Sequence, residues 1–210
     1  MEINSFGPLE VSPTTVDADG VSASQSPGAG AILINGALAS GGVATITNNG
    51  AQLIRLTSGG NDSGITFTFA GTDSDNRAQS ETVAGTNASN SNTTKYFKTI
   101  TGITHTGSVA TTIVVGNLID SVSNTVRPNL DTSPIAIGIG VIVVSGSPTY
   151  KVQHSYQDGT VSHPTLWFDN TAGAKTASSE ATYAAPVGTI RILVTVAASG
   201  VLIGNIIQGG

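Results

Sequence analysis

The feature that most constrains the fold is a series of short, alternating apolar segments along almost the whole chain. Each is rich in Val, Ile, Thr or Phe and is bounded by Gly, Asn, Ser or Asp, as β-strands between tight turns are. No window of a dozen residues has the i, i+3, i+4, i+7 spacing of an amphipathic helix. The pattern predicts about thirteen strands, at residues 31–35, 43–47, 52–58, 64–71, 77–84, 95–101, 110–115, 135–144, 149–157, 165–169, 181–184, 188–197 and 201–207.

These segments form two groups, which predicts an all-β fold of two antiparallel β-sandwich or jelly-roll-like modules. The N-terminal β module is expected at residues 28–118 and the C-terminal β module at 135–210. Residues 119–134 contain two prolines and lack alternation, so we expect a connector there. Residues 1–27 are rich in Ser, Pro and Gly and are predicted to form an extended N-terminal arm. One continuous double sheet is the alternative arrangement.

The segment 135–144 has two unlike faces, because successive side chains of a strand point to opposite sides. One face carries only Ile and Val. A face of small residues lets another backbone approach closely, which predicts that this strand is buried on both sides. The second face consists of Ala136, Gly138, Gly140, Ile142 and Val144.

The acidic run Asp73-Ser74-Asp75-Asn76 lies between two alternating segments, where it could be a calcium loop, a catalytic acid pair or a turn. A calcium loop of the EF-hand type has Gly at its sixth position and Glu at its twelfth. Counted from Asp73, these positions hold Ala78 and Ala84. Asn and Asp favour tight strand reversals, so we predict a hairpin turn that binds no metal.

The charge and composition of the chain argue against several classes of function. The net charge is −5 and the eight Lys and Arg residues are scattered, so we expect no binding of nucleic acid or of an anionic membrane. The N-terminus lacks the basic and apolar regions of a signal peptide, and no apolar run approaches the length of a membrane span. Charged residues make up 10% of the chain, which favours a protein packed among neighbours in an assembly.

No pattern of residues predicts catalysis, a cofactor or a metal. There is no Cys, and neither His105 nor His163 has a second His or a carboxylate at metal-ligand spacing. His154 alternates with aromatic and apolar residues and is expected on a core face, whereas His105 and His163 lie in loop-like contexts. We therefore predict that the chain is not an enzyme.

The segment PTLWFDN, residues 164–170, is the most ligand-like stretch. An aromatic plate at Trp167 beside the polar groups of Asp169 and Asn170 could stack on a sugar ring and bind its hydroxyls. Trp167 and Phe168 are neighbours on a predicted strand and so face opposite sides, which places at least one of them in the core. Ordinary packing is the competing interpretation.

Two groups of segments resemble known proteins. GGNDSGITFTFAGTDSDNRAQSETVAG, TKYFKTITGITHTG and TTIVVG (59–85, 94–107 and 111–116) resemble a module of small virion structural proteins of tailed bacteriophages. The later TYKVQHSYQDGT, PTLWFDN, YAAPVGTIRILVTV and GNIIQGG resemble a β module that often accompanies it. This family includes head decoration, head-to-tail and tail-associated parts.

The resemblance implies a virion structural protein that is made in the host cytoplasm. The role that it favours is a capsid decoration or cement protein that self-associates, as a homo-oligomer of unspecified symmetry, and binds the major capsid protein. A head-to-tail or tail-associated component is the alternative within this class. A glycan- or receptor-binding module of a fibre or spike is the alternative from another class. The resemblance assigns a role to no individual residue.

Overall fold

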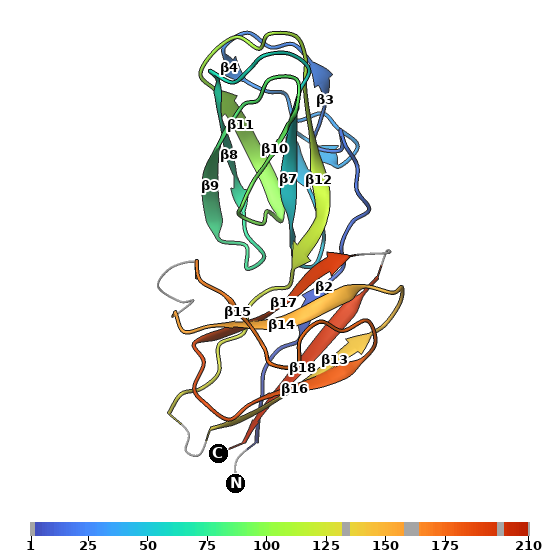
Figure 1. Cartoon of the computed structure of the whole chain (residues 1–210), viewed down its shortest axis with the longest axis vertical. Helices are drawn as coiled ribbons and strands as arrows, with labels where there is room; N and C mark the ends of the chain where they lie inside the picture. Colours follow the sequence, from blue (N-terminus) through green and yellow to red (C-terminus); the bar gives the residue numbers. More distant parts are fainter. Residues whose placement is uncertain (1–2, 132–134, 158–163, 197–199, 210) are drawn as a thin grey trace. The chain divides into compact units, whose positions relative to one another are not determined.

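The computed structural model describes residues 3–131, 135–157, 164–196 and 200–209. Regular structure in these residues is β-strand, arranged in three antiparallel sheets, which confirms the all-β class (Figure 1). No described segment forms a helix that is long and apolar enough to cross a bilayer. The chain folds as two compact units, which we call the N-terminal unit, Thr14–Ser121, and the C-terminal unit, Met1–Pro13 with Val122–Gly210.

The N-terminal unit packs two groups of strands around one core. One group has the order β5-β6-β11-β8-β9, with β4 beside β11, and the other has the order β10-β7-β12, with β3 beside β12. Their bounds are β3 (Ser22–Gln25), β4 (Gly30–Ala31), β5 (Ala39–Ser40), β6 (Val43–Thr45), β7 (Ala51–Ser58), β8 (Thr66–Thr72), β9 (Ala78–Ala84), β10 (Asn90–Asn92), β11 (Thr99–His105) and β12 (Ile113–Val122).

The core of the N-terminal unit follows from the period-two alternation of its strands. Phe67 and Phe69 of β8 are fully buried, while Thr66 and Thr68, which alternate with them, are only partly buried. Ile54 and Leu56 of β7 belong to the same core cluster, so both groups of strands contribute to it. This arrangement is a β-sandwich.

The run from Asp73 to Asn76 is a hairpin turn between β8 and β9, as predicted from the sequence. The Asp73 carboxylate Oδ1 accepts the backbone N–H of Asp75 at 2.9 Å and that of Arg77 at 2.8 Å. Asn76 has a φ of 62°, a left-handed conformation that Asn tolerates better than most residues. The Arg77 guanidinium pairs with the Asp75 carboxylate at 2.7 Å. The acidic side chains therefore serve the turn itself.

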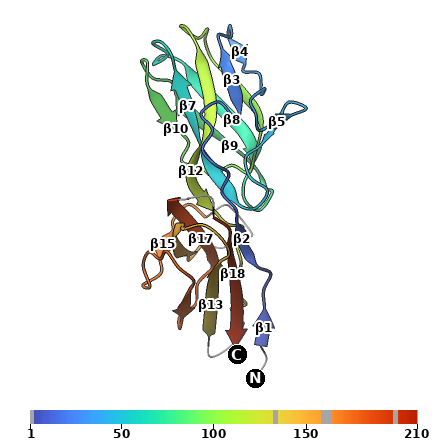
Figure 2. The same cartoon turned by 90° about the vertical axis from the view of Figure 1, so that its right-hand side faces the viewer.

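The C-terminal unit is also a two-layer arrangement. One layer has the order β1-β18-β13-β16, with β2 also paired to β18, and Figure 2 shows β1, β18 and β13 side by side. The other layer has the order β17-β14-β15. The bounds are β1 (Ile3–Ser5), β2 (Leu9–Val11), β13 (Ala136–Val143), β14 (Thr149–Ser155), β15 (Phe168–Asp169), β16 (Ser179–Tyr183), β17 (Thr189–Val196) and β18 (Leu202–Gly209).

The strand β13 differs from its sequence-based expectation. Its Ile and Val face is buried, with Ile137, Ile139 and Val141 each 2% exposed. The opposite face is not buried, since Ile142 is 48% exposed and Gly140 is partly exposed. Small residues permit close approach of another layer, but within the described residues no layer of the C-terminal unit covers this face.

The N-terminal segment also differs from the expected extended arm. Within residues 1–27, β1 and β2 pair with β18, and β3 pairs with β12. Leu9 and Val11 are fully buried in the core of the C-terminal unit, because they flank Glu10 in a short alternating strand. The N-terminal unit begins at Thr14 rather than at residue 28.

The expected connector at 119–134 also holds regular structure. Strand β12 continues as far as Val122. Beyond it, the Ser123 N–H donates to the Ile192 carbonyl at 2.9 Å, and Val126 forms an antiparallel bridge with Ile190. The segment that we expected only to link the modules thus pairs with β17 inside the C-terminal unit.

Substitutions in the hairpin turn are expected to differ in cost. Asp73→Ala removes the acceptor of two backbone N–H groups and should lower the free energy of unfolding by about 1–2 kcal/mol. Asp75→Ala removes a partly exposed ion pair with Arg77, and it should cost about 0.5 kcal/mol or less. Urea denaturation measures both values. A larger cost for Asp75→Ala, or stabilisation of the wild type by added calcium, would contradict this account of the turn.

Leu9→Ala tests whether the N-terminal segment is part of a core. Because Leu9 is fully buried, its truncation should destabilise the C-terminal unit by about 2–4 kcal/mol. Leu33 is 68% exposed, so Leu33→Ala provides a control expected to change stability by less than about 0.5 kcal/mol. Equal unfolding midpoints for the two variants in urea would show that the segment is a dispensable arm.

Candidate functional site

The ligand-like segment of the sequence lies at the edge strand β15. Phe168 pairs with His154 of β14, and Asp169 pairs with Gln153. Paired residues project from the same face of a sheet, so Phe168 and Asp169 occupy opposite faces. The two faces of β15 present different chemistry.

The face that carries Trp167 and Asp169 is engaged in contacts within the protein. The Arg191 guanidinium carbon lies 3.8 Å from the centroid of the Trp167 ring. The Asp169 carboxylate accepts hydrogen bonds from Lys151 Nζ at 2.6 Å and Gln153 Nε2 at 2.9 Å, and these bonds lower the pKa of Asp169. The Trp167 ring and the Asp169 carboxylate on this face are therefore already held by contacts within the protein.

Asn170 has a structural role. It is 6% exposed, its Oδ1 accepts the Ala172 N–H at 2.9 Å, and its Nδ2 donates to the Thr182 carbonyl at 3.2 Å. These bonds fix the turn that follows β15. The structure thus brings Trp167 and Asp169 to one face, and turns Asn170 inward.

The opposite face carries four rings in mutual contact, which we call the His154 cluster: His154, Tyr156, Phe168 and Tyr183. The His154 centroid lies 5.2 Å from Tyr156, 5.7 Å from Phe168 and 5.0 Å from Tyr183. Tyr156 and Phe168 are 66% and 41% exposed, so neither ring is a core residue. We expected Trp167 or Phe168 in the core, but Trp167 is partly buried outside the core cluster and Phe168 is exposed. The alternation of β14 predicted the neighbours of His154 on its own strand, whereas Tyr183 comes from β16 of the other layer.

The polar atoms of the cluster are only partly satisfied. His154 Nδ1 is buried and has no hydrogen-bond partner among the described residues. The Tyr183 hydroxyl is also buried, and it lies close enough to the Asn170 side chain for that side chain to affect its pKa. Burial lowers the pKa of His154 and raises the pKa of Tyr183 to about 12. Both groups are consequently neutral at pH 7, and Asp169, on the other face, is paired with Lys151. The cluster is an uncharged aromatic surface with polar atoms.

Two other side chains that could take part in chemistry, His105 and Asp62, are buried and form contacts within the fold. His105 is 6% exposed, stacks on Phe67 with centroids 5.7 Å apart, and shares a hydrogen bond of 2.7 Å with the Gly107 carbonyl. His163 lies outside the described residues. Asp62 is fully buried and accepts the Ala110 N–H at 2.8 Å. Across the described parts of the chain, no three His, Cys, Asp or Glu side chains are grouped to hold a metal ion.

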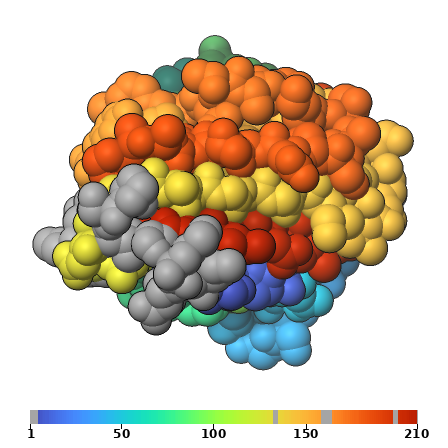
Figure 3. Space-filling model, turned by 90° about the horizontal axis from the view of Figure 1, so that it is seen from below, coloured from blue at the N-terminus to red at the C-terminus, as the bar shows by residue number. Residues whose placement is uncertain are grey.

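The outer face of the layer β1-β18-β13-β16 is a second candidate surface, which we call the glycine face. A Cβ added to Gly140 would meet no atom within 4 Å, and one added to Gly138 would meet only the Ile207 carbonyl oxygen at 4.0 Å. Ile142 and Ile207 are 48% and 53% exposed on this face. Figure 3 shows the strands side by side from orange (β16) through yellow (β13) and red (β18) to blue (the N-terminal segment).

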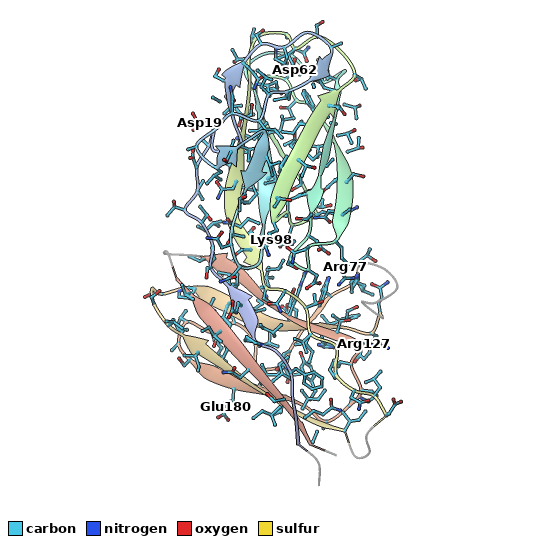
Figure 4. The ribbon with its side chains drawn as sticks, turned by 180° about the vertical axis from the view of Figure 1, so that it is seen from behind. Asp19, Asp62, Arg77, Lys98, Arg127 and Glu180 are labelled. Carbon is cyan, nitrogen blue, oxygen red and sulfur yellow. The ribbon has the colours of Figure 1, made fainter. Side chains whose placement is uncertain are left out.

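The glycine face carries little charge. Its five strands contain two charged residues, Glu10 and Glu180. Glu180 pairs with Gly140 in register and is exposed, and Figure 4 shows its side chain pointing away from the ribbon. In register, Gly140 lies between exposed Glu180 and Asn205, and Gly138 lies between exposed Thr182 and Ile207. The face therefore combines apolar and polar side chains around an open strip, and its charged groups are acidic.

Exposed apolar side chains are concentrated in the C-terminal unit. A soluble protein rarely exposes large contiguous apolar patches unless they bind something. The N-terminal unit has three exposed large apolar residues among its described residues, Val16, Leu33 and Val43. The C-terminal unit has eight: Leu130, Ile142, Val144, Tyr156, Leu166, Phe168, Val196 and Ile207.

Comparisons with known proteins add little to this description. No protein-family model matches the chain, and no curated protein matches its sequence. Among solved structures, the PBSX exported protein XepA is similar over 99% of this chain and 86% of its own, at 7% sequence identity and a TM-score of 0.29. This distant likeness carries no argument about function.

The lowered pKa of His154 predicts a pH dependence of stability. Protonation favours the unfolded state, where the pKa is near 6.5, so the contribution of neutral His154 is present above pH 6.5 and is lost as the pH falls through the lower folded pKa. The wild type should lose melting temperature between pH 7 and pH 5 more steeply than His154→Gln, which stays neutral. Thermal melts across this range compare the two slopes; parallel slopes would contradict a buried neutral imidazole.

Proposed function

We propose that this chain is a non-enzymatic structural protein of a tailed-bacteriophage virion, and that it docks on another virion protein through the glycine face. The observation that carries the proposal is an open sheet face whose centre is Gly138 and Gly140, flanked by exposed Ile142 and Ile207. A strip without side chains accepts the ridge of a partner at close range, and its neighbours across the sheet offer both apolar contact (Ile207) and polar contact (Glu180 and Asn205). Burial of such a face is favourable at about 25 cal/mol per Å² of apolar surface.

The chemistry of the face defines its partner. The partner should present apolar side chains that fill the glycine strip, because a gap at an interface forfeits contacts. Since both charged residues of the face, Glu10 and Glu180, are acidic, the partner should carry Lys or Arg around its apolar centre. We assign this role to the major capsid protein.

Within the virion, we propose a capsid decoration or cement role, with self-association of the chain and many copies per particle. Many modest contacts give tight overall attachment when the copies are linked to one another. The resemblance of residues 59–85 to small virion proteins and the 10% of charged residues support this assignment. We propose likewise that the protein is made in the host cytoplasm and is carried on the virion afterwards. A head-to-tail or tail-associated component is the second candidate, because the glycine face would suit docking there equally.

Gly140→Arg tests docking without disturbing the fold. Gly140 has open space beyond its Cα and is not among the glycines of positive φ, so the variant should melt near the wild-type temperature. Its long charged side chain should block the partner and lower incorporation into the parent particle by about tenfold or more, a loss of about 1.4 kcal/mol or more. Quantitative mass spectrometry of purified particles measures the copies incorporated.

Gly102→Arg is the matched control, because Gly102 lies on β11 of the N-terminal unit and also has open space beyond its Cα. This variant should be incorporated at the wild-type level. Equal incorporation of Gly140→Arg and Gly102→Arg would overturn docking through the glycine face. A wild-type copy number that corresponds to a single ring of about six or twelve subunits would replace the decoration role by the head-to-tail or tail role.

A further inference from the structure

The His154 cluster combines two properties that no other exposed part of the described chain shares. It presents two exposed aromatic rings, Tyr156 and Phe168, whose centroids lie 5.7 Å apart with their planes tilted by 58°. It also contains a buried ring nitrogen, His154 Nδ1, that has no hydrogen-bond partner among the described residues.

The surroundings of the two ring nitrogens of His154 indicate which of them carries the proton. His154 Nδ1 is buried without a hydrogen-bond partner. His154 Nε2 has no hydrogen bond within the described residues and is not among the atoms that are both buried and unpartnered, so it keeps some contact with solvent. A proton on Nδ1 would leave a donor unsatisfied inside the protein, which favours the tautomer with the proton on Nε2. His154 therefore offers a neutral N–H donor at the surface, beside the rings of Tyr156 and Phe168.

The surroundings favour an uncharged ligand. The nearest carboxylate of the strand, Asp169, projects from the opposite face and is held by Lys151 and Gln153. Tyr183 is neutral at pH 7, as an ordinary tyrosine is, and burial raises its pKa further, to about 12. A neutral ligand with one apolar face for the rings and hydroxyl groups for the polar atoms matches these features, and a sugar ring has both.

We propose that the His154 cluster is a carbohydrate-binding site that stacks a neutral sugar residue of a surface polysaccharide on Phe168 and Tyr156 and binds its hydroxyls through His154 Nε2. The site lies on the face of β15 opposite Trp167, the ring that the sequence singled out. It involves other residues than the glycine face, so it stands or fails separately from the proposed docking function. A single exposed site of this kind binds weakly, and many copies on one particle would hold a polymer by repeated contacts.

The test is an NMR titration of the whole protein with methyl glucoside, methyl galactoside and methyl N-acetylglucosaminide. Saturable shifts of the His154 cluster with at least one of these sugars are expected. Phe168→Leu keeps apolar bulk but loses the stacking ring, and should weaken that affinity by about tenfold. Tyr156→Leu provides a second variant at the more exposed ring and should weaken the affinity similarly.

Trp167→Leu is the matched control, because it removes the aromatic ring from the opposite face of the same edge strand. It should leave the affinity within about twofold of the wild type, a difference below about 0.5 kcal/mol. The absence of saturable shifts with all three sugars would overturn the proposal. So would loss of binding in Trp167→Leu with binding retained in Phe168→Leu. Reduced particle incorporation of Phe168→Leu without any sugar binding would instead make the cluster a protein contact.

Discussion

Burial of one side of every long strand between two layers is the constraint on which the rest of this structure depends. In the N-terminal unit it buries Phe67 and Phe69, and in the C-terminal unit it buries Ile190, Ile192 and Val194. With few charges in the chain, apolar burial and ladder hydrogen bonds carry the stability. The residues between the buried positions face outward, and it is there that the two units differ.

The outward positions give the C-terminal unit two surfaces of different chemistry. The glycine face is open in its centre, mixes apolar and polar side chains and is acidic in its charged groups. The His154 cluster is aromatic and neutral and has polar atoms at selected positions. Exposed apolar area lowers solubility and gives nothing to the stability of the isolated unit. The C-terminal unit nevertheless exposes apolar area on two separate surfaces, and for this physical reason we assign binding to both.

Much of the candidate site lies beyond what residue patterns reveal. The pattern of PTLWFDN drew attention to Trp167, but the structure covers that ring with Arg191 and leaves Phe168 exposed. The sequence contains no signal that Tyr183 meets His154, because the two residues are on different layers and the contact depends on how those layers stack. Alternation does predict that Tyr156 shares a face with His154, since that relation is local.

The sequence by itself determined the all-β class, the alternation of the strands and the turn at Asp73 to Asn76, because these depend on neighbouring residues and on the preferences of Asp and Asn for turn conformations. Only the tertiary structure decided that Leu9 and Val11 complete the core of the C-terminal unit and that the Gly138–Gly140 side of β13 stays open. An apolar or glycine-rich face is compatible with burial and with docking alike. Which of the two it serves depends on whether another layer covers it, and that is set by contacts between residues far apart in the chain.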